Sequence, residues 1–335
     1  MLALLQAYRG LAALLVVIYH AEGAANAYFD SRSAWFHFGA AGVQFFFVLS
    51  GYIIYHIHRH DIGTGKVAQY ARKRVVRIYP VYIFVTLLLA PFWLWVPSLG
   101  EPYNKDVGAL LLSLALIPQN HLPHLGVAWT LIHEMLFYIV FGVAIFNRKL
   151  GASLIALWFI AVAVANIFGH PVGRASYFLS LNNLLFGLGM LAAWLPERRG
   201  LATAVALFVI GNLGFLAAGL WTNLGAEPPL LAFGLASFLI VMQAKPLNFL
   251  FRERRFLLFL GDASYSIYLI HYPVIAIACK ILQAIGFSYG AMPLLAVLGT
   301  LGGIALHVSI ERPLLRFFGR RRPPASEAPA SSPMR

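Results

Sequence analysis

The sequence predicts an all-α, polytopic integral membrane protein with about ten transmembrane helices and both termini in the cytoplasm. Of its 335 residues, 60% are hydrophobic and only 11% are charged, whereas charged residues make up about a quarter of an ordinary soluble domain. The hydrophobic residues form blocks close to the roughly 20 residues that a helix needs to cross a bilayer. The basic residues form short clusters between these blocks, and the positive-inside rule places those clusters in the cytoplasm.

The net charge of +13 comes from 25 Lys and Arg residues against 12 Asp and Glu residues. Proteins that bind nucleic acid arrange such charge along one face or interleave it with aromatic side chains in a groove. Here the charge follows the ends of the hydrophobic blocks, so it indicates topology and we expect no nucleic-acid partner. The single cysteine, Cys279, excludes an internal disulfide, and we expect no metal site.

The order of apolar blocks and basic clusters defines the expected helices. An additional apolar stretch at 107–117 is only about half as long as a span, and we expect it to be re-entrant or interfacial. Residues 1–319 then form one transmembrane domain, and the Pro-, Ala- and Ser-rich residues 320–335 form a disordered cytoplasmic tail. The ten expected spans are residues 2–20, 39–58, 77–97, 128–146, 150–168, 175–194, 202–221, 228–243, 257–282 and 290–311.

The first expected span carries Arg9 and His20, and polar residues inside lipid are costly enough to mark functional sites. Eleven helical steps rotate about 1100° and rise about 16 Å, so both side chains lie on one face. Singly, Arg9 is explained as a topology anchor and His20 as an interfacial residue. Together they suit group transfer across a membrane, with arginine on a phosphate and histidine taking a hydroxyl proton. Such chemistry requires a polar route between them.

The second and third expected spans add small and basic residues. Ser50 and Gly51 lie within an apolar run, where small residues usually allow helices to pack closely. Arg74 and Arg77 have i,i+3 spacing at the entrance to the third span, so both guanidinium groups can address one polyanion. Topology alone also explains positive charge at this position.

The fourth expected span contains Glu134, an acidic residue well inside an apolar block and close to the depth of His20. A carboxylate in this environment must find a partner or take up a proton. One solution is a His20–Glu134 pair, in which the carboxylate holds the imidazole tautomer. The alternative is a purely structural pair with His133 or Arg174.

The last two expected spans also carry polar residues. The ninth has a stripe with i,i+3 and i,i+4 spacing, for which hydrogen bonding between helices is the alternative explanation. His121 and His124 lie in an outer loop and are candidates for acceptor contact. Glu311, followed by Pro313, is expected to end the tenth span and to pair with an arginine. The stripe comprises Asp262, Ser264, Tyr265, Tyr268 and His271.

Six short motifs in this order resemble those of the acyltransferase-3 family of bacterial membrane O-acyltransferases. Each motif alone is weak, and together they extend through most of the chain. Thr130 stands where the family more often has serine, and His133 where an apolar residue is usual. The motifs are Arg9 with His20, Phe45 to Ile54, Arg74 to Pro80, Trp129 to Tyr138, Gly261 to His271, and Glu311 to Pro313.

The resemblance implies a donor, an acceptor and a set of site residues. The donor would be cytoplasmic acyl-CoA, with acetyl-CoA as the default, and the acceptor a hydroxyl of a cell-surface or lipid-linked carbohydrate at the inner (cytoplasmic) membrane. His20 would act as general base or as transient acyl carrier, supported by Glu134. Donor-binding residues would be Arg9, Arg74, Arg77 and Tyr79, and substrate-binding residues Trp129, Tyr138, Ser264, Tyr265 and His271.

Two other classes of function were weighed against the enzyme. A proton-coupled transporter of an anionic solute would also use intramembrane Arg, His and Glu, but the sequence shows neither the internal repeat nor the matched helix breaks common in transporters. A structural membrane scaffold would leave the polar residues without a use. The sequence contains no P-loop, HExxH or GxSxG motif. Homo-oligomeric assembly is compatible with this sequence.

Overall fold

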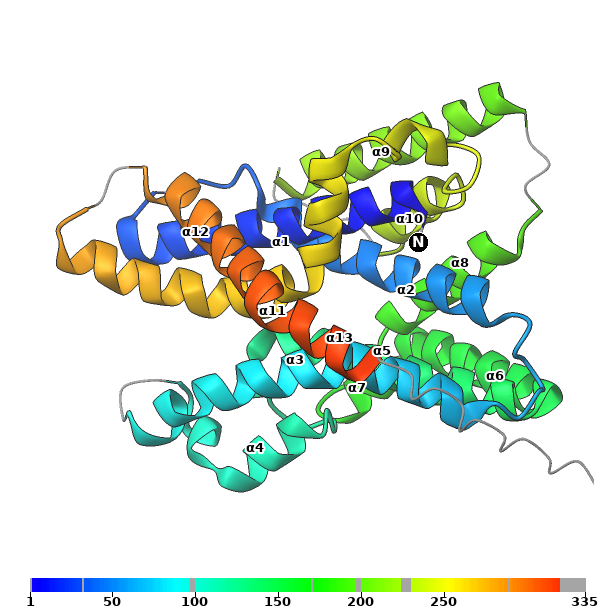
Figure 1. Ribbon diagram of the computed structural model, residues 1–335, viewed down its shortest axis with the longest axis horizontal. Coiled ribbons are helices and arrows are strands. Elements are labelled where there is room, and N and C mark those ends of the chain that lie inside the picture. The colour runs from blue at the N-terminus through cyan, green and yellow to red at the C-terminus, as the bar shows by residue number, and fades with distance from the viewer. Residues whose placement is uncertain are drawn as a thin grey trace, which may run out of the picture.

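The computed structural model describes residues 2–31, 33–96, 100–169, 171–196, 200–223, 230–287 and 290–319. Every regular element in these ranges is a helix, which confirms the all-α prediction (Figure 1). The expected tail at 320–335 lies outside the described residues. The longer helices are α1 (Ala3–Phe29), α2 (Gly42–His58), α3 (Val67–Trp95), α5 (Trp129–Phe146), α6 (Arg148–Phe168), α8 (Asn182–Trp194), α9 (Leu201–Asn223), α10 (Leu230–Val241), α11 (Arg255–Ala284) and α12 (Ala291–Leu306).

Shorter elements connect these helices. α4 (Val107–Leu114) and α7 (Ala175–Leu179) are short α-helices, and α12 continues through a π-helical turn (His307–Glu311) into α13 (Arg312–Gly319). The 3₁₀ turns are His37–Ala41, Pro102–Lys105, Gly126–Ala128 and Asn248–Phe251.

Nine helical segments within the described ranges are long and apolar enough to cross a membrane, so the chain is a multi-pass membrane protein. They correspond to nine of the ten expected spans. The remaining one, expected at 228–243, is α10, which has 12 residues and a length of about 18 Å. The eight residues of α4 are too few to cross, as the length of that apolar stretch indicated. The side of the membrane on which the termini lie stays a prediction.

Two helix boundaries differ from expectation. α3 begins at Val67 rather than at residue 77, because the polar residues before 77 are mostly good helix formers and extend the span instead of forming a loop. The last span does not end at Pro313. The π-helical turn shifts the register so that Pro313 is the second residue of α13, where a missing backbone N–H costs little.

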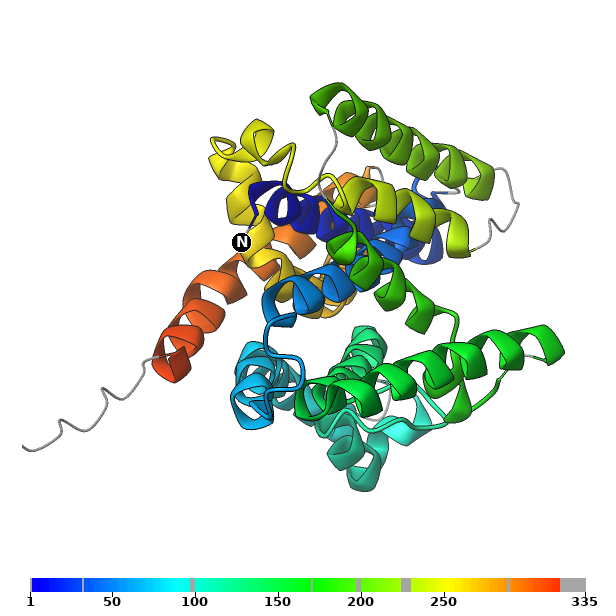
Figure 2. The ribbon, with the colours of Figure 1, turned by 90° about the vertical axis from the view of Figure 1, so that its right-hand side faces the viewer.

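The helices form two groups, which Figure 2 shows as an upper and a lower layer. In the larger group α1 packs against α11 and α12, and α2 packs against α8 and α10; the smaller group contains α3 to α7. The expected packing role of Gly51 is confirmed, because a Cβ atom there would lie 2.0 Å from the carbonyl oxygen of Phe186 on α8. The space between the two groups holds the candidate site.

Candidate active site

A cavity of about 410 Å³, called the central cavity below, lies between the two helix groups. Helices α1, α2 and α11 line it from one group, and α3 and α5 from the other. Most of its remaining wall is aliphatic or phenylalanine side chain. The polar lining residues are Arg9, Ser50, Lys73, Arg74, Arg77, Thr130, Glu134, Tyr138, Ser264, Tyr265 and Tyr268.

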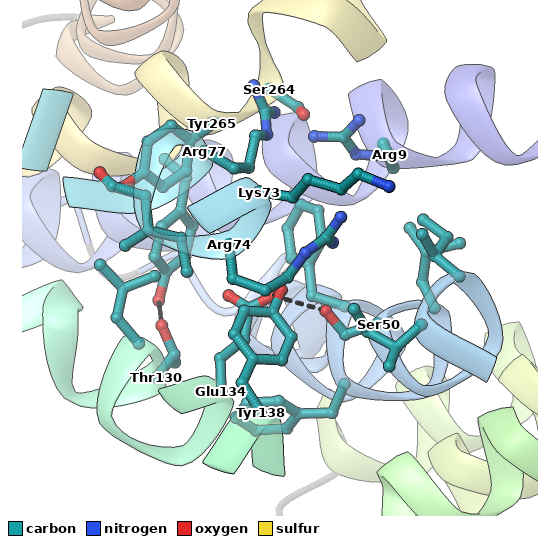
Figure 3. A pocket seen from close by; sticks show the side chains of 18 of the residues that line it. Arg9, Ser50, Lys73, Arg74, Arg77, Thr130, Glu134, Tyr138, Ser264 and Tyr265 are labelled. Carbon is teal, nitrogen blue, oxygen red and sulfur yellow. Dashed lines mark hydrogen bonds between the residues drawn. The ribbon is translucent and has the colours of Figure 1, made fainter. Parts of the chain in front are cut away.

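The central cavity is strongly basic, since its described lining has four cationic side chains and one carboxylate, that of Glu134. Figure 3 shows the nitrogen ends of Arg9, Lys73 and Arg74 gathered on one side of the cavity. The Arg74 guanidinium stacks on the Tyr138 ring at 5.8 Å, and its buried Nε has no hydrogen-bond partner in the described structure. This arrangement suits a polyanion, for which arginine supplies several directed donors.

Arg77 differs from the other cations because its charge is balanced within the protein. Its Nη1 lies 2.7 Å from Oε1 of the fully buried Glu311, which confirms the expected pairing of Glu311 with an arginine. The second carboxylate oxygen accepts a hydrogen bond of 2.7 Å from the Ser266 hydroxyl and lies 2.7 Å from Nδ1 of His307. Arg77 therefore lines the cavity while tying α3 to α11 and to the π-helical turn.

Glu134 faces the central cavity, but it does not pair with His20 as proposed from the sequence. Its Oε1 accepts hydrogen bonds from the Ser50 hydroxyl at 2.6 Å and from the Tyr138 hydroxyl (Figure 3). Neither structural alternative is seen, because the described partners of the Glu134 carboxylate are the Ser50 and Tyr138 hydroxyls, and His133 pairs with Asn183 instead. Spacing along α1 and α5 indicated a similar depth, but not that His20 faces α11.

His20 lines a second cavity of about 430 Å³, called the outer cavity below, together with Tyr19, Glu22, His37 and Tyr272. The His20 ring lies 5.1 Å from the rings of both His271 and Tyr272. The ring contacts of His20 outside its own helix are thus with His271 and Tyr272 on α11.

His271 lies behind the walls of both cavities. Its side chain is fully buried, with Nδ1 3.0 Å from the carbonyl oxygen of Ile267 and Nε2 without a partner in the described part of the chain. On its other side is Tyr268, with 5.9 Å between ring centroids. Tyr268 lines the central cavity, and its hydroxyl lies 2.9 Å from that of Thr130. Among the described residues, the central and outer cavities share no lining residue, and the rings of Tyr268 and His271 lie between the central cavity and His20. The polar route expected between Arg9 and His20 is therefore closed here.

The remaining predicted site residues divide into two sets. Tyr138, Ser264 and Tyr265 line the central cavity. Tyr79 does not line it, because its hydroxyl donates to the carbonyl of Ala115 beyond α4. Trp129 lines a third cavity on the opposite side of α5. Sequence reasoning did not single out Lys73 or Ser50 as site residues. Lys73 lies in a basic cluster that topology alone explains. Ser50 precedes Gly51, and the pair was interpreted as a site of close helix packing.

Comparison with known proteins gives a family match over most of the chain. The model of a family described as "Acyltransferase domain", of the acyltransferase-3 type, matches residues 3–312. The exopolysaccharide production protein ExoZ of Rhizobium meliloti is 35% identical over 86% of this chain and 93% of its own length. Acyltransferase MdmB of Streptomyces mycarofaciens is 28% identical over 86% and 84%, and the O-acetyl transferase of Shigella phage Sf6 is 26% identical over 86% and 89%. No solved structure matches the chain.

Proposed function

Because the chain belongs to the acyltransferase-3 family and is an acyltransferase, we propose that it moves an acyl group from cytoplasmic acyl-CoA to a hydroxyl of a cell-surface or lipid-linked carbohydrate. The relative named an O-acetyl transferase favours acetyl, and the exopolysaccharide production protein favours a polysaccharide acceptor. In this proposal the protein lies in the inner (cytoplasmic) membrane, because a cytoplasmic donor and an exported glycan meet there. The main support for the proposal is that the basic central cavity and the outer cavity, which contains His20, are separated by the side chains of Tyr268 and His271.

The central cavity suits the donor. Coenzyme A is a polyanion with a long, uncharged arm, and the cavity combines gathered cations with an otherwise apolar wall. Lys73 and Arg74 would bind phosphate, because charge-assisted hydrogen bonds are the strongest available to a protein. The uncharged arm would then extend past Ser50 and Glu134 toward Tyr268. The charge of Arg77 is already balanced by Glu311. Arg77 would therefore hold α3 in place at the cavity wall and contribute less to binding the phosphates of the donor.

Replacing Arg74 by glutamine is expected to raise KM for acyl-CoA about 10-fold, since a hydrogen bond to a charged group contributes about 1.5 to 3 kcal/mol. KM for acyl-pantetheine, which lacks the nucleotide phosphates, should stay nearly unchanged. Steady-state kinetics of the purified protein with both donors measures the difference. The matched control is Arg72→Gln, because Arg72 is an exposed residue of the same helix that does not line the cavity. An equal rise in KM for the two donors would contradict phosphate binding by Arg74.

The outer cavity suits the acceptor and the chemistry. His20 would take the proton of the acceptor hydroxyl while that oxygen attacks the thioester carbonyl. The carbon–sulfur bond then breaks, the ester forms, and the thiolate takes the proton from the imidazolium to leave as free coenzyme A. As general base or as transient acyl carrier, His20 needs a ring nitrogen that faces the reactants. The Tyr268 ring lies between the central cavity and His271, so transfer requires the Tyr268 side chain to shift when the donor binds while His271 stays beside His20.

We infer that His271, rather than Glu134, orients His20. The carbonyl of Ile267 accepts the Nδ1 proton of His271 in a neutral ring, which leaves Nε2 as an unused acceptor beside His20. An N–H of His20 that donates to this nitrogen would be fixed in one tautomer, the role that a carboxylate has in a catalytic triad.

A His271→Phe variant is expected to lower kcat about 10²-fold, because the ring volume is kept but the acceptor for His20 is lost. KM for acyl-CoA should be unchanged, since His271 does not line the central cavity. His271→Gln, which retains an acceptor oxygen, should recover part of kcat. A positioning role would be refuted if Phe and Gln variants lost activity equally, or if KM rose while kcat held.

A further inference from the structure

A third cavity of about 410 Å³, called the loop cavity below, lies at the start of α5. It is formed by the connection between α4 and α5, by the first turns of α5 and by the connection between α6 and α8. Its lining residues are Gln119, Asn120, His121, Leu122, Trp129, His133, Gly173, Ser176, Tyr177, Ser180 and Asn182.

Helix α5 separates the loop cavity from the central cavity. Trp129 and His133, spaced i,i+4, line the loop cavity, whereas Thr130 and Glu134 line the central one. A shift of one residue turns a side chain by about 100°, so the two pairs face different sides of the helix. In the described part of the chain, the loop cavity shares no lining residue with the central or outer cavity, so a ligand there would not occupy the transfer point.

The loop cavity and the outer cavity lie at the same end of the helices. Figure 1 shows α1, α2 and α3 running across the molecule in alternating directions. Only the short α4 and two 3₁₀ turns separate α3 from α5, so α5 starts near the end of the bundle where α1 and α3 end. Each cavity is partly open to the surroundings. One extended molecule outside the bundle can therefore contact both.

The lining of the loop cavity is polar, and none of its described residues is Asp, Glu, Lys or Arg. Aromatic surface comes from Trp129 and Tyr177, and amide groups come from Gln119, Asn120 and Asn182. A sugar ring has an apolar C–H face and a rim of hydroxyls, which match aromatic surface and amides respectively. An anionic donor would lack a cation here, and an acyl chain would leave the amides unsatisfied.

Two amide oxygens of this lining have unused acceptor capacity. Oε1 of Gln119, a side chain only 3% exposed, has no hydrogen-bond partner among the described residues, and neither has Oδ1 of Asn182. The other end of the Gln119 amide is fixed, because Nε2 donates to the Ser113 hydroxyl at 3.1 Å. Buried acceptors without a partner are costly. A ligand hydroxyl would therefore stabilise either amide if its oxygen turned toward the cavity.

From these features we propose that the loop cavity binds a neutral sugar unit of the acceptor chain, away from the hydroxyl that is acylated. The proposal rests on the carbohydrate acceptor of the proposed function. In this proposal the loop cavity makes binding depend on acceptor length. An acceptor of several sugar units contacts both the loop cavity and the outer cavity, whereas a single unit that is being acylated occupies only the outer cavity at His20. The loop cavity then contributes to the affinity for polymer and not to the chemical step.

The test uses de-O-acylated surface polysaccharide from cells that carry the gene, hydrolysed into oligosaccharides of defined length. With the full chain in detergent, Gln119→Ala and Asn182→Ala are each expected to weaken binding of long oligosaccharides about fivefold, the value of one neutral hydrogen bond. In transfer assays KM for long acceptors should rise by the same factor, while kcat and KM for the single unit stay constant. Asn223→Ala is the matched control, because its amide oxygen also lacks a partner but lines none of the three cavities.

The binding assay contains no donor, so it separates this proposal from the proposed function. Suppose that long oligosaccharides bind more tightly than short ones, that both variants weaken this binding, and that the wild-type protein transfers no acyl group. This result would support the sugar site and refute the proposed acyl transfer. Transfer whose KM does not depend on acceptor length, or variants that bind long oligosaccharides as tightly as the control, would refute the sugar site.

Discussion

Replacing His20 by alanine is expected to lower acyl transfer about 10²- to 10⁴-fold, the usual contribution of a positioned general acid–base group. Folding should be unaffected, because His20 borders the outer cavity and its contacts in the described structure are ring contacts with Tyr19, His271 and Tyr272. The measurement is transfer of labelled acyl groups from acyl-CoA by purified protein, with the elution profile and thermal midpoint recorded in parallel.

His37→Ala is the matched control for this variant. His37 lines the same outer cavity, and its ring packs on Tyr19. If His20 carries the chemistry, the His37 variant should retain most of the activity. Full activity of His20→Ala would remove His20 from the mechanism as base and as acyl carrier alike, whereas equal losses in both variants would point to the shape of the cavity instead.

Arg77→Met is expected to destabilise the protein by about 3 to 5 kcal/mol, the cost of removing one partner from a buried ion pair. Removing Arg77 should destabilise the protein more than removing Glu311, because the two side chains differ in burial. Glu311 is fully buried whereas the Arg77 side chain is 32% exposed, so loss of Arg77 leaves a carboxylate with only Ser266 and His307. Because Cys279 is the one cysteine and is buried, its reaction rate with a thiol dye during heating reports unfolding.

The double variant Arg77→Met with Glu311→Leu supplies the control, since no unpaired buried charge remains in it. It should be more stable than Arg77→Met alone, although Ser266 and His307 lose their acceptor. Should Arg77→Met unfold at the wild-type temperature, the pair would not hold α3 to the π-helical turn. A double variant less stable than either single one would show that other contacts of Glu311 matter more.

The membrane class and most helix positions could be predicted because lipid makes hydrophobic length a direct signal of a span. Two helix boundaries were predicted wrongly, one at a cluster of basic residues and one at a proline. The basic residues before Arg77 were assigned to a loop, although good helix formers at a span end continue the helix. Pro313 was expected to stop a helix, but the π-helical turn places it where proline is tolerated.

The candidate site could be predicted in part, for a physical reason. Charged residues inside spans are rare, so Arg9 and Glu134 were found from the sequence, and both line the central cavity. Which side chains meet depends on how helices pack, and periodicity along one helix does not contain that information. The sequence thus indicated a carboxylate partner for His20, whereas the packing of α1 against α11 places the rings of His271 and Tyr272 beside it.

The most direct test of the account uses the purified protein in liposomes, oriented with the Arg74 end of the helices facing labelled acyl-CoA and with oligosaccharide on the opposite side. The account predicts labelled ester on the oligosaccharide, formed only with acyl-CoA present and lost in His20→Ala. Movement of an anionic solute across the liposome membrane without acyl-CoA, and without any ester formed, would contradict it.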